Sequence, residues 1–215
     1  MLRNVLRILA MAMLLLVIVV SGGGMAFLRR PVAVAYLGLW AVWGFSTMLL
    51  RPAGERSSYD QSQKVALGLL GVLTLPLLLI GPAWEYARFH GPLPRDGAIA
   101  WIGIGIFALS IALQAWAMCR LSGLYTVRLG IQPGHKLVTT GPYRLVRHPG
   151  YLGFILSVMG IALALGSLAA LACEIIAVGF ILWRIRREEA MLAERFGEEY
   201  RQYARKTRRL VPFIY

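Results

Sequence analysis

The chain has 215 residues, of which 58% are hydrophobic and 15% charged, and its mean hydropathy is +0.64. This composition is too apolar for an ordinary soluble domain and indicates a single integral membrane domain. The formal net charge is +13, and the sequence contains no nucleic-acid-binding motif. Basic residues beside anionic lipid headgroups explain this charge. We therefore expect membrane lipids, and no nucleic acid, among the partners.

Six long segments carry almost no charge, and most approach the roughly 20 residues that an α-helix needs to cross the hydrocarbon layer. They cover residues 5–20, 32–50, 65–80, 98–119, 151–165 and 168–183. The first has a basic start and is followed by small residues, as in a signal peptide, but we expect it to remain a membrane span. The last two are separated only by Gly166 and Ser167 and predict a helical hairpin. The predicted fold class is all-α, a polytopic membrane bundle of five to six spans with a carboxy-terminal hairpin and an amphipathic tail helix.

The basic residues predict the orientation of this bundle. If all six segments cross, the amino terminus, the loops at 51–64 and 120–147 and the carboxyl tail share one side. That side carries 19 of the 23 lysines and arginines, which marks it as cytoplasmic. We expect an integral membrane protein with both termini and the active site in the cytoplasm, and the short chain favours a prokaryotic inner membrane.

The chain divides by character into two parts of one membrane domain. Residues 1–119 are apolar spans with short loops and predict a scaffold, whereas residues 120–215 contain polar loops and predict the catalytic, cofactor-binding part. The two cysteines, Cys119 and Cys173, lie in or at the end of apolar segments, and nothing beside them in sequence would stabilise a thiolate. We expect them to be packing residues, and we expect no metal site.

A polar loop leads directly into the fifth apolar segment. Pro149 disfavours α geometry at His148 and suits the first turn of a helix, so His148 and Tyr151 are expected at a helix entrance. Unpaired amides at such an entrance favour anionic or hydrogen-bond-accepting ligand groups. Gly153 and Gly160 further along allow a backbone or a ligand to come close, and we favour close helix packing.

The tail predicts an amphipathic helix that emerges from the last span and breaks near Gly197. Its apolar residues recur at helical spacing: Ile185, Leu192, Phe196, Tyr200 and Tyr203. Arg184 and Glu188 lie one turn apart on a shared face, where a functional pair and a plain surface ion pair are both open interpretations. Glu174 is an acid within an apolar segment, and we favour a basic partner across the bundle over a role in the site.

The spacing of these polar residues is similar to that of a known family. The pattern is His135-x-Leu137-Val138-x-x-Gly141-x-Tyr143, Arg147-His148-Pro149-x-Tyr151-x-Gly153, Arg184, Glu188-Glu189-x-x-Leu192, Phe196-Gly197-Glu198-Glu199-Tyr200-x-x-Tyr203 and Val211-Pro212-Phe213-Ile214. Over about the last eighty residues the chain resembles the isoprenylcysteine carboxyl methyltransferases. These membrane enzymes use S-adenosylmethionine to methylate the carboxylate of a carboxy-terminal prenylated cysteine.

The resemblance implies S-adenosyl-L-methionine as cofactor and a prenylated or otherwise lipidic substrate as methyl acceptor. The cofactor-binding residues that it implies are His135, Lys136, Leu137, Val138, Tyr143, His148, Pro149, Gly150, Tyr151 and Glu188. It implies Arg184 as the catalytic and substrate-binding residue, which holds the acceptor carboxylate. No metal ion is implied.

The chemistry agrees with these residue types. Methyl transfer from a sulfonium is an in-line displacement, so the protein mainly has to hold the two reactants at near-attack distance with little water. A carboxylate acceptor is ionised at neutral pH and needs no general base. An arginine can orient that carboxylate by a bidentate contact, and a glutamate suits the ammonium group of the cofactor.

Three other functions remain open alternatives. A phospholipid N-methyltransferase shares the cofactor, but its amine acceptor must lose a proton, which predicts a base near the methyl group and less use for Arg184. A NADPH-dependent membrane sterol reductase can show a similar Arg-His-Pro-x-Tyr-x-Gly pattern, but Glu188-Glu189 followed by Phe196-Gly197 argues against it. A transporter or structural membrane protein fits the first half of the chain and leaves the last eighty residues unexplained.

Overall fold

The computed structural model describes residues 2–50, 78–89, 96–121 and 137–211. The helices in these ranges are α1 (Leu2–Ser21), α2 (Met25–Leu28), α3 (Pro31–Leu50), α5 (Gly81–Arg88), α6 (Ala98–Leu121), the 3-10 helix η1 (Gly141–Arg144), α7 (Pro149–Leu165) and α8 (Leu168–Lys206). No strand forms within them, and one isolated parallel bridge joins Val146 to Arg208. The all-α prediction is confirmed for the described part of the chain.

The apolar segments of the sequence coincide with these helices. Helices α3, α6 and α8 are long and apolar enough to cross a membrane, while α1 and α7 are shorter apolar helices. The helical hairpin is confirmed, because α7 ends at Leu165 and α8 begins at Leu168. The segment at 65–80 lies almost entirely outside the described residues, so the number of five to six spans stays a prediction.

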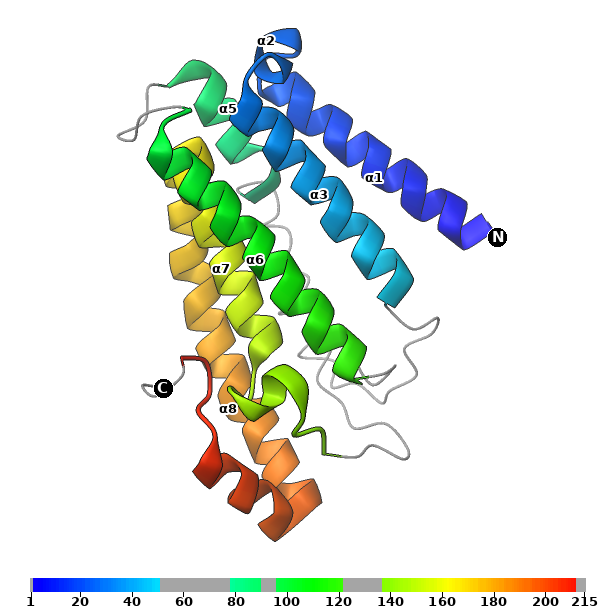
Figure 1. Cartoon of the computed structure of the whole chain (residues 1–215), viewed down its shortest axis with the longest axis vertical. Helices are drawn as coiled ribbons and strands as arrows, with labels where there is room; N and C mark the ends of the chain where they lie inside the picture. The colour runs from blue at the N-terminus through cyan, green and yellow to red at the C-terminus, as the bar shows by residue number, and fades with distance from the viewer. Residues whose placement is uncertain (1, 51–77, 90–95, 122–136, 212–215) are drawn as a thin grey trace.

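The long helices form a bundle (Figure 1). Helices α3, α6 and α8 run toward the same end of the molecule, and α7 begins there and runs back along α6 and α8. Beyond that end, α8 continues as a projecting helix that carries the charged tail. The polar loop before α7 and the carboxyl tail therefore lie together, as the candidate site requires.

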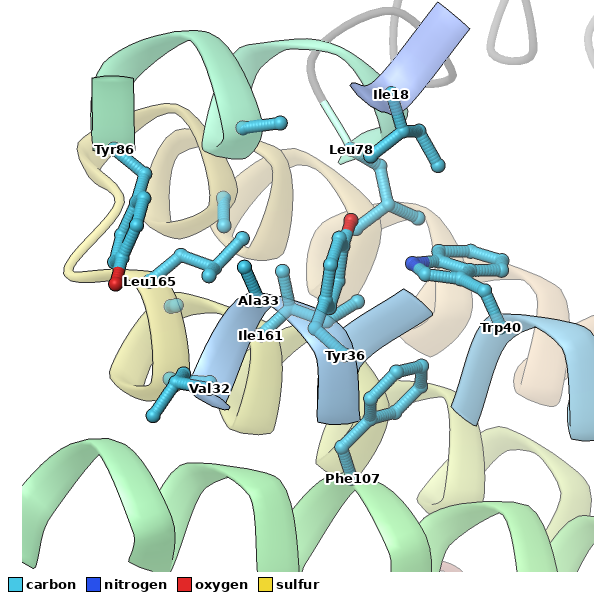
Figure 2. Close-up of a cluster of buried hydrophobic side chains, with 14 of the residues drawn as sticks. Ile18, Val32, Ala33, Tyr36, Trp40, Leu78, Tyr86, Phe107, Ile161 and Leu165 are labelled. Atoms are coloured by element: carbon cyan, nitrogen blue, oxygen red, sulfur yellow. The ribbon is translucent and has the colours of Figure 1, made fainter. Parts of the chain in front are cut away.

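Aromatic side chains fill the core between α3, α6 and α7 (Figure 2). Trp40 packs edge-on against Phe107 with ring centroids 5.8 Å apart, and against Tyr36 at 6.3 Å. Edge-on aromatic pairs add about 0.5–1.5 kcal/mol to the burial of their surface. Ile18 of α1 and Ile161 of α7 complete the cluster, which connects the first helices of the chain to the hairpin.

Glycines allow α6 and α7 to pack backbone against backbone. A Cβ atom built on Gly103 would lie 2.7 Å from the carbonyl oxygen of Gly160, and one on Gly160 would lie 2.7 Å from the amide nitrogen of Phe107. At Gly153 it would lie 2.6 Å from Cγ of Gln114. Distances this short exclude a side chain, so the expected close packing is confirmed at Gly153 and Gly160.

The end of the hairpin farthest from the polar loop is held by an acid of α5. Glu85 accepts hydrogen bonds from the Ser167 hydroxyl at 2.5 Å and from the amide nitrogen of Ala169 at 3.1 and 3.2 Å. The Ser167 oxygen also accepts from the amide of Ala170 at 3.0 Å, the normal bond of a helix N-cap. Glu85 therefore fixes the beginning of α8 to α5.

Helix α8 runs 39 residues, from the hairpin to the end of the tail. Its regular geometry breaks at Gly197, where φ is 54° and ψ is −122°, as the sequence predicts. Both carboxylate oxygens of Glu174 are buried and have no hydrogen-bond partner in the described ranges. The basic partner expected for Glu174 is thus not among the residues that the structure describes.

Candidate active site

The entrance of α7 has the geometry expected from its proline. Pro149 is the first helical residue, and His148 precedes it with φ of −125° and ψ of 60°, outside the α region. His148 is only 5% exposed, and its ring lies 5.7 Å from the ring of Tyr151. The imidazole is therefore a packed group at the helix entrance, with its own fixed partners.

The Tyr151 hydroxyl links Arg184 and Glu188. Arg184 Nε donates a hydrogen bond to the Tyr151 oxygen at 2.5 Å, and the hydroxyl donates to Glu188 Oε2 at 2.8 Å. The guanidinium carbon also lies 5.8 Å from the centre of the Tyr151 ring. One hydroxyl thus holds a cation and a carboxylate at a set separation where α7 meets α8.

The burial of Arg184 excludes one of the two interpretations of the Arg184 and Glu188 pair. Arg184 is 6% exposed, so the plain surface ion pair is wrong. A guanidinium taken out of water is unfavourable unless acceptors or an anion compensate it. In this structure the Tyr151 hydroxyl is one acceptor of the Arg184 guanidinium.

A second charged group, the Glu189 cluster, lies directly beside this arrangement. Glu189 Oε1 accepts from Arg147 Nε at 2.7 Å and lies 3.3 Å from His148 Nε2, while its Oε2 accepts from Arg209 Nε at 2.8 Å. The Glu189 side chain is 12% exposed. Burial alone raises the pKa of this carboxyl, but the hydrogen bonds from the three basic side chains outweigh burial and lower the pKa of Glu189 to about 2.

Backbone hydrogen bonds join the same loop to the carboxyl segment at residues 207–210. The amide of Arg147 donates to the carbonyl of Arg208 at 2.7 Å, and the amide of His148 donates to that of Arg209 at 3.0 Å. The Arg147 guanidinium also donates to the carbonyls of Ala204 and Thr207. The carboxyl segment therefore covers the loop before α7 and fixes the backbone of His148.

The Glu189 cluster is the part of the site for which the sequence predicts no role. Successive helical residues point about 100° apart, so neighbouring glutamates cannot face the same group. Glu188 faces Tyr151, and Glu189 faces the loop with Arg147 and His148. The adjacent pair of acids is the signal in the sequence that could have predicted this cluster. Only one of the two acids can bind the proposed cofactor, so the other needs a different partner.

The structure brings part of the predicted residue set together. Tyr151, Arg184 and Glu188 are in contact, and His148, Pro149 and Gly150 form the adjacent entrance of α7. The backbone of Tyr143 in η1 is tied to the tail, because its carbonyl accepts from the Tyr203 hydroxyl at 2.7 Å. Leu137 and Val138 precede η1 and are half-buried. The predictions for His135 and Lys136 fall outside the described residues.

Comparison with known proteins identifies the family. The model of the isoprenylcysteine carboxyl methyltransferase family matches residues 101–194. Protein-S-isoprenylcysteine O-methyltransferase B of Arabidopsis thaliana is 32% identical over 133 residues, which are 60% of this chain and 67% of that protein. The chain belongs to the isoprenylcysteine carboxyl methyltransferase family. The resemblance inferred from the spacing of the polar residues is thereby confirmed.

Two further relatives and one solved structure extend the comparison. A probable protein-S-isoprenylcysteine O-methyltransferase of Oryza sativa subsp. indica is 33% identical over 119 residues, and the chain spans 62% of its length. The methanethiol S-methyltransferase of a Pseudomonas strain is 30% identical over 166 residues, 74% of this chain and 60% of that protein. The solved structure of the eukaryotic intramembrane Ras methyltransferase has a TM-score of 0.62 at 19% identity, and the match covers 97% of this chain and 75% of that one.

These matches establish the fold as that of a helical membrane protein of the family. Within the ranges that the structure describes, no group of three or more His, Cys, Asp or Glu side chains is placed to hold a metal ion. Cys173 is buried in the core, as a packing residue would be, whereas Cys119 is exposed on α6.

Proposed function

We propose that this chain is an S-adenosylmethionine-dependent membrane methyltransferase that methylates the carboxylate of a prenylated cysteine or a similar lipidic acceptor. The observation that supports this most is the link from buried Arg184 through the Tyr151 hydroxyl to Glu188. It offers one anion-binding and one cation-binding group side by side at the end of a membrane helix. Two reactants of opposite charge can therefore be held next to each other there.

The residues present fit the cofactor. Glu188 uses Oε2 to accept from Tyr151, and Oε1 has no hydrogen bond in the described part of the chain, so an ammonium group can be bound there. Leu137 and Val138 are half-buried and offer apolar surface. S-adenosylmethionine, when bound, supplies an electrophilic methyl group.

The protein's own residues perform binding and orientation. Arg184 binds the acceptor carboxylate and orients it toward the cofactor position, and Tyr151 sets the separation between acceptor and cofactor. The carboxylate is ionised at neutral pH, so no side chain has to remove a proton. Burial keeps water away from Arg184, which strengthens its attraction for the carboxylate.

The charge of Arg184 favours an anionic acceptor over an amine. A buried guanidinium repels the ammonium form of a phospholipid amine, which makes a phospholipid N-methyltransferase the weaker alternative. A small thiol is the second candidate acceptor, because the relative that methylates methanethiol matches 74% of this chain. A thiolate, like a carboxylate, is an anion that Arg184 can bind.

The orientation and division of the protein are part of this proposal. The excess of basic residues supports a cytoplasmic side that contains both termini and the active site. Residues 1–119 then act as the membrane scaffold, and residues 120–215 as the catalytic part. A lipidic acceptor would enter from the bilayer, while the charged cofactor would come from the cytoplasm.

Calorimetric titration of the purified protein with S-adenosylhomocysteine and with NADPH tests the cofactor assignment. We expect saturable binding of S-adenosylhomocysteine alone, and binding of NADPH alone would refute the proposal. Methyl transfer to an S-prenylated cysteine and to methanethiol then compares the two acceptors.

Variants separate the proposed roles. Arg184→Ala should raise the KM of the acceptor at least tenfold with little effect on cofactor affinity, and Glu188→Gln should weaken cofactor binding by a similar factor. The exposed neighbour Arg186→Ala serves as the control and should change neither. If Arg184→Ala weakened cofactor binding and Glu188→Gln raised the KM of the acceptor, the proposed roles of these two residues would be contradicted.

A further inference from the structure

A separate cavity lies between the loop before η1 and the end of α8. Its volume is about 360 Å³, and its lining residues are Thr139, Arg144, Tyr203, Lys206 and Thr207. This is within the range of about 300–1,000 Å³ that small-molecule sites occupy. None of these five residues belongs to the site proposed above.

Both charged residues of this cavity are basic. Arg144 and Lys206 are its two charged residues, and neither has an ion pair or hydrogen bond in the ranges that the structure describes. Two acids of α8 are bound to other cations, since Glu189 accepts from Arg147 and Arg209, and Glu198 pairs with Arg201 and Arg205. Two cations that line one cavity favour an anionic ligand there.

The walls of the cavity are held in place by hydrogen bonds within the protein. The Tyr203 hydroxyl donates to the carbonyl of Tyr143, and the Thr207 hydroxyl donates to the carbonyl of Tyr203 at 2.8 Å. Arg147 bonds to the carbonyls of Ala204 and Thr207, which fixes the end of α8 against the loop. The two cations therefore extend from a preformed frame.

The level of the cavity in the bundle indicates the source of the anion. Helix η1, which carries Arg144, packs against the end of α6, and a Cβ on Gly141 would lie 2.8 Å from Cγ of Arg120. Arg120 is the charged residue that follows the apolar sequence of α6, and α7 begins its apolar sequence at Pro149. The cavity thus lies where the hydrocarbon layer gives way to headgroups, which are phosphate-rich.

From this geometry we propose that the cavity binds the phosphate group of an anionic membrane lipid, between Arg144 and Lys206. Thr139 is the lining hydroxyl whose proton is not already donated to a backbone carbonyl in the described part of the chain, and it is placed to donate to a phosphate oxygen. The headgroup would attach the end of α8 to the bilayer beside the active site. This assignment does not depend on the methyltransferase activity.

Calorimetry on the full-length protein in a neutral detergent tests the proposal, with dihexanoyl phosphatidylglycerol as the lipid probe and inorganic phosphate as the second ligand. We expect saturable binding of the lipid that is at least tenfold weaker in the Arg144→Gln, Lys206→Gln double variant. Tighter binding of inorganic phosphate than of the lipid would overturn the assignment to a headgroup, and absence of lipid binding would overturn the site itself.

Two further double variants exclude trivial causes. Arg186→Gln with Arg195→Gln removes the same charge from exposed positions outside the cavity and should leave the affinity within threefold. Arg144→Lys with Lys206→Arg keeps both charges and should also retain binding within threefold. The proposal would be overturned if the Arg186→Gln, Arg195→Gln variant lost as much lipid affinity as the Arg144→Gln, Lys206→Gln variant. An equally large loss of affinity in the Arg144→Lys, Lys206→Arg variant would also overturn it.

Discussion

Replacement of Glu189 by glutamine should detach the carboxyl segment at residues 207–210 from the loop before α7. Glu189 is 12% exposed and binds three basic side chains at 2.7, 2.8 and 3.3 Å. Glutamine keeps the size of the side chain but removes the charge, so it leaves Arg147 and Arg209 without their anion. Breaking such a buried pair costs about 3–5 kcal/mol.

The pKa of Glu189 gives a second measure of the same interaction. A carboxyl whose pKa falls from 4.5 to about 2 is favoured in its ionised form by about 3 kcal/mol, at 1.36 kcal/mol for each tenfold change. A change of about 3 kcal/mol in the opening of the carboxyl segment raises the open population on the order of a hundredfold. When opening and closing are fast, proteolysis follows that population.

Trypsin cleavage after Arg209, followed by mass spectrometry of the intact protein, measures this opening. We expect cleavage in Glu189→Gln to be on the order of a hundredfold faster than in the unmodified protein. Glu194→Gln removes an exposed acid of the same helix and should leave the rate unchanged. Acceleration of less than threefold in Glu189→Gln would show that the carboxylate does not hold the carboxyl segment.

Two further predictions concern pH and helix packing. Because the folded-state pKa of Glu189 is depressed, its contribution to stability is complete above about pH 4.5 and is lost as the pH falls toward about 2. The thermal midpoint measured by circular dichroism should therefore be level from about pH 8 to 5 and then decline. The decline should be less steep in Glu189→Gln. Gly160→Ala should destabilise the protein by about 1–3 kcal/mol, since its Cβ would lie 2.7 Å from the Phe107 amide nitrogen. Gly105→Ala is the control, because a Cβ there would have no atom within 4 Å. It should be neutral or stabilising in the same melting experiment. Equal midpoints at neutral pH for the two alanine variants would contradict the packing argument.

The helices could be predicted because each follows from a local feature of the sequence. Apolar length predicts α3 and α6, Pro149 predicts the start of α7, and Gly197 predicts the break in α8. For Arg184 and Glu188, helical spacing predicts only that the two side chains lie on one face of the helix. Their separation by the Tyr151 hydroxyl depends on how α7 packs against α8, which no local pattern contains.

The Glu189 cluster could not be predicted for a different reason. It joins residues of α8, the loop before α7 and the carboxyl segment, and its contacts span 20 to 42 positions along the chain. The tail contains many basic residues, and nothing in the sequence distinguishes Arg209 from the others as the partner of an acid. Only the packing of the tail on the loop selects Arg209 from its neighbours.

The position of Tyr151 between Arg184 and Glu188 depends on contacts outside the site. The register of α7 against α8 is held at one end by Glu85 at the start of α8 and at the other by Glu189 at the loop before α7. A shift of one residue along a helix moves a side chain by about 1.5 Å and rotates it by about 100°, enough to break the 2.5 and 2.8 Å hydrogen bonds of the Tyr151 hydroxyl. The close contact between Gly103 of α6 and Gly160 of α7 fixes α7 against α6 as well. Three junctions therefore set the separation between the proposed acceptor and cofactor groups.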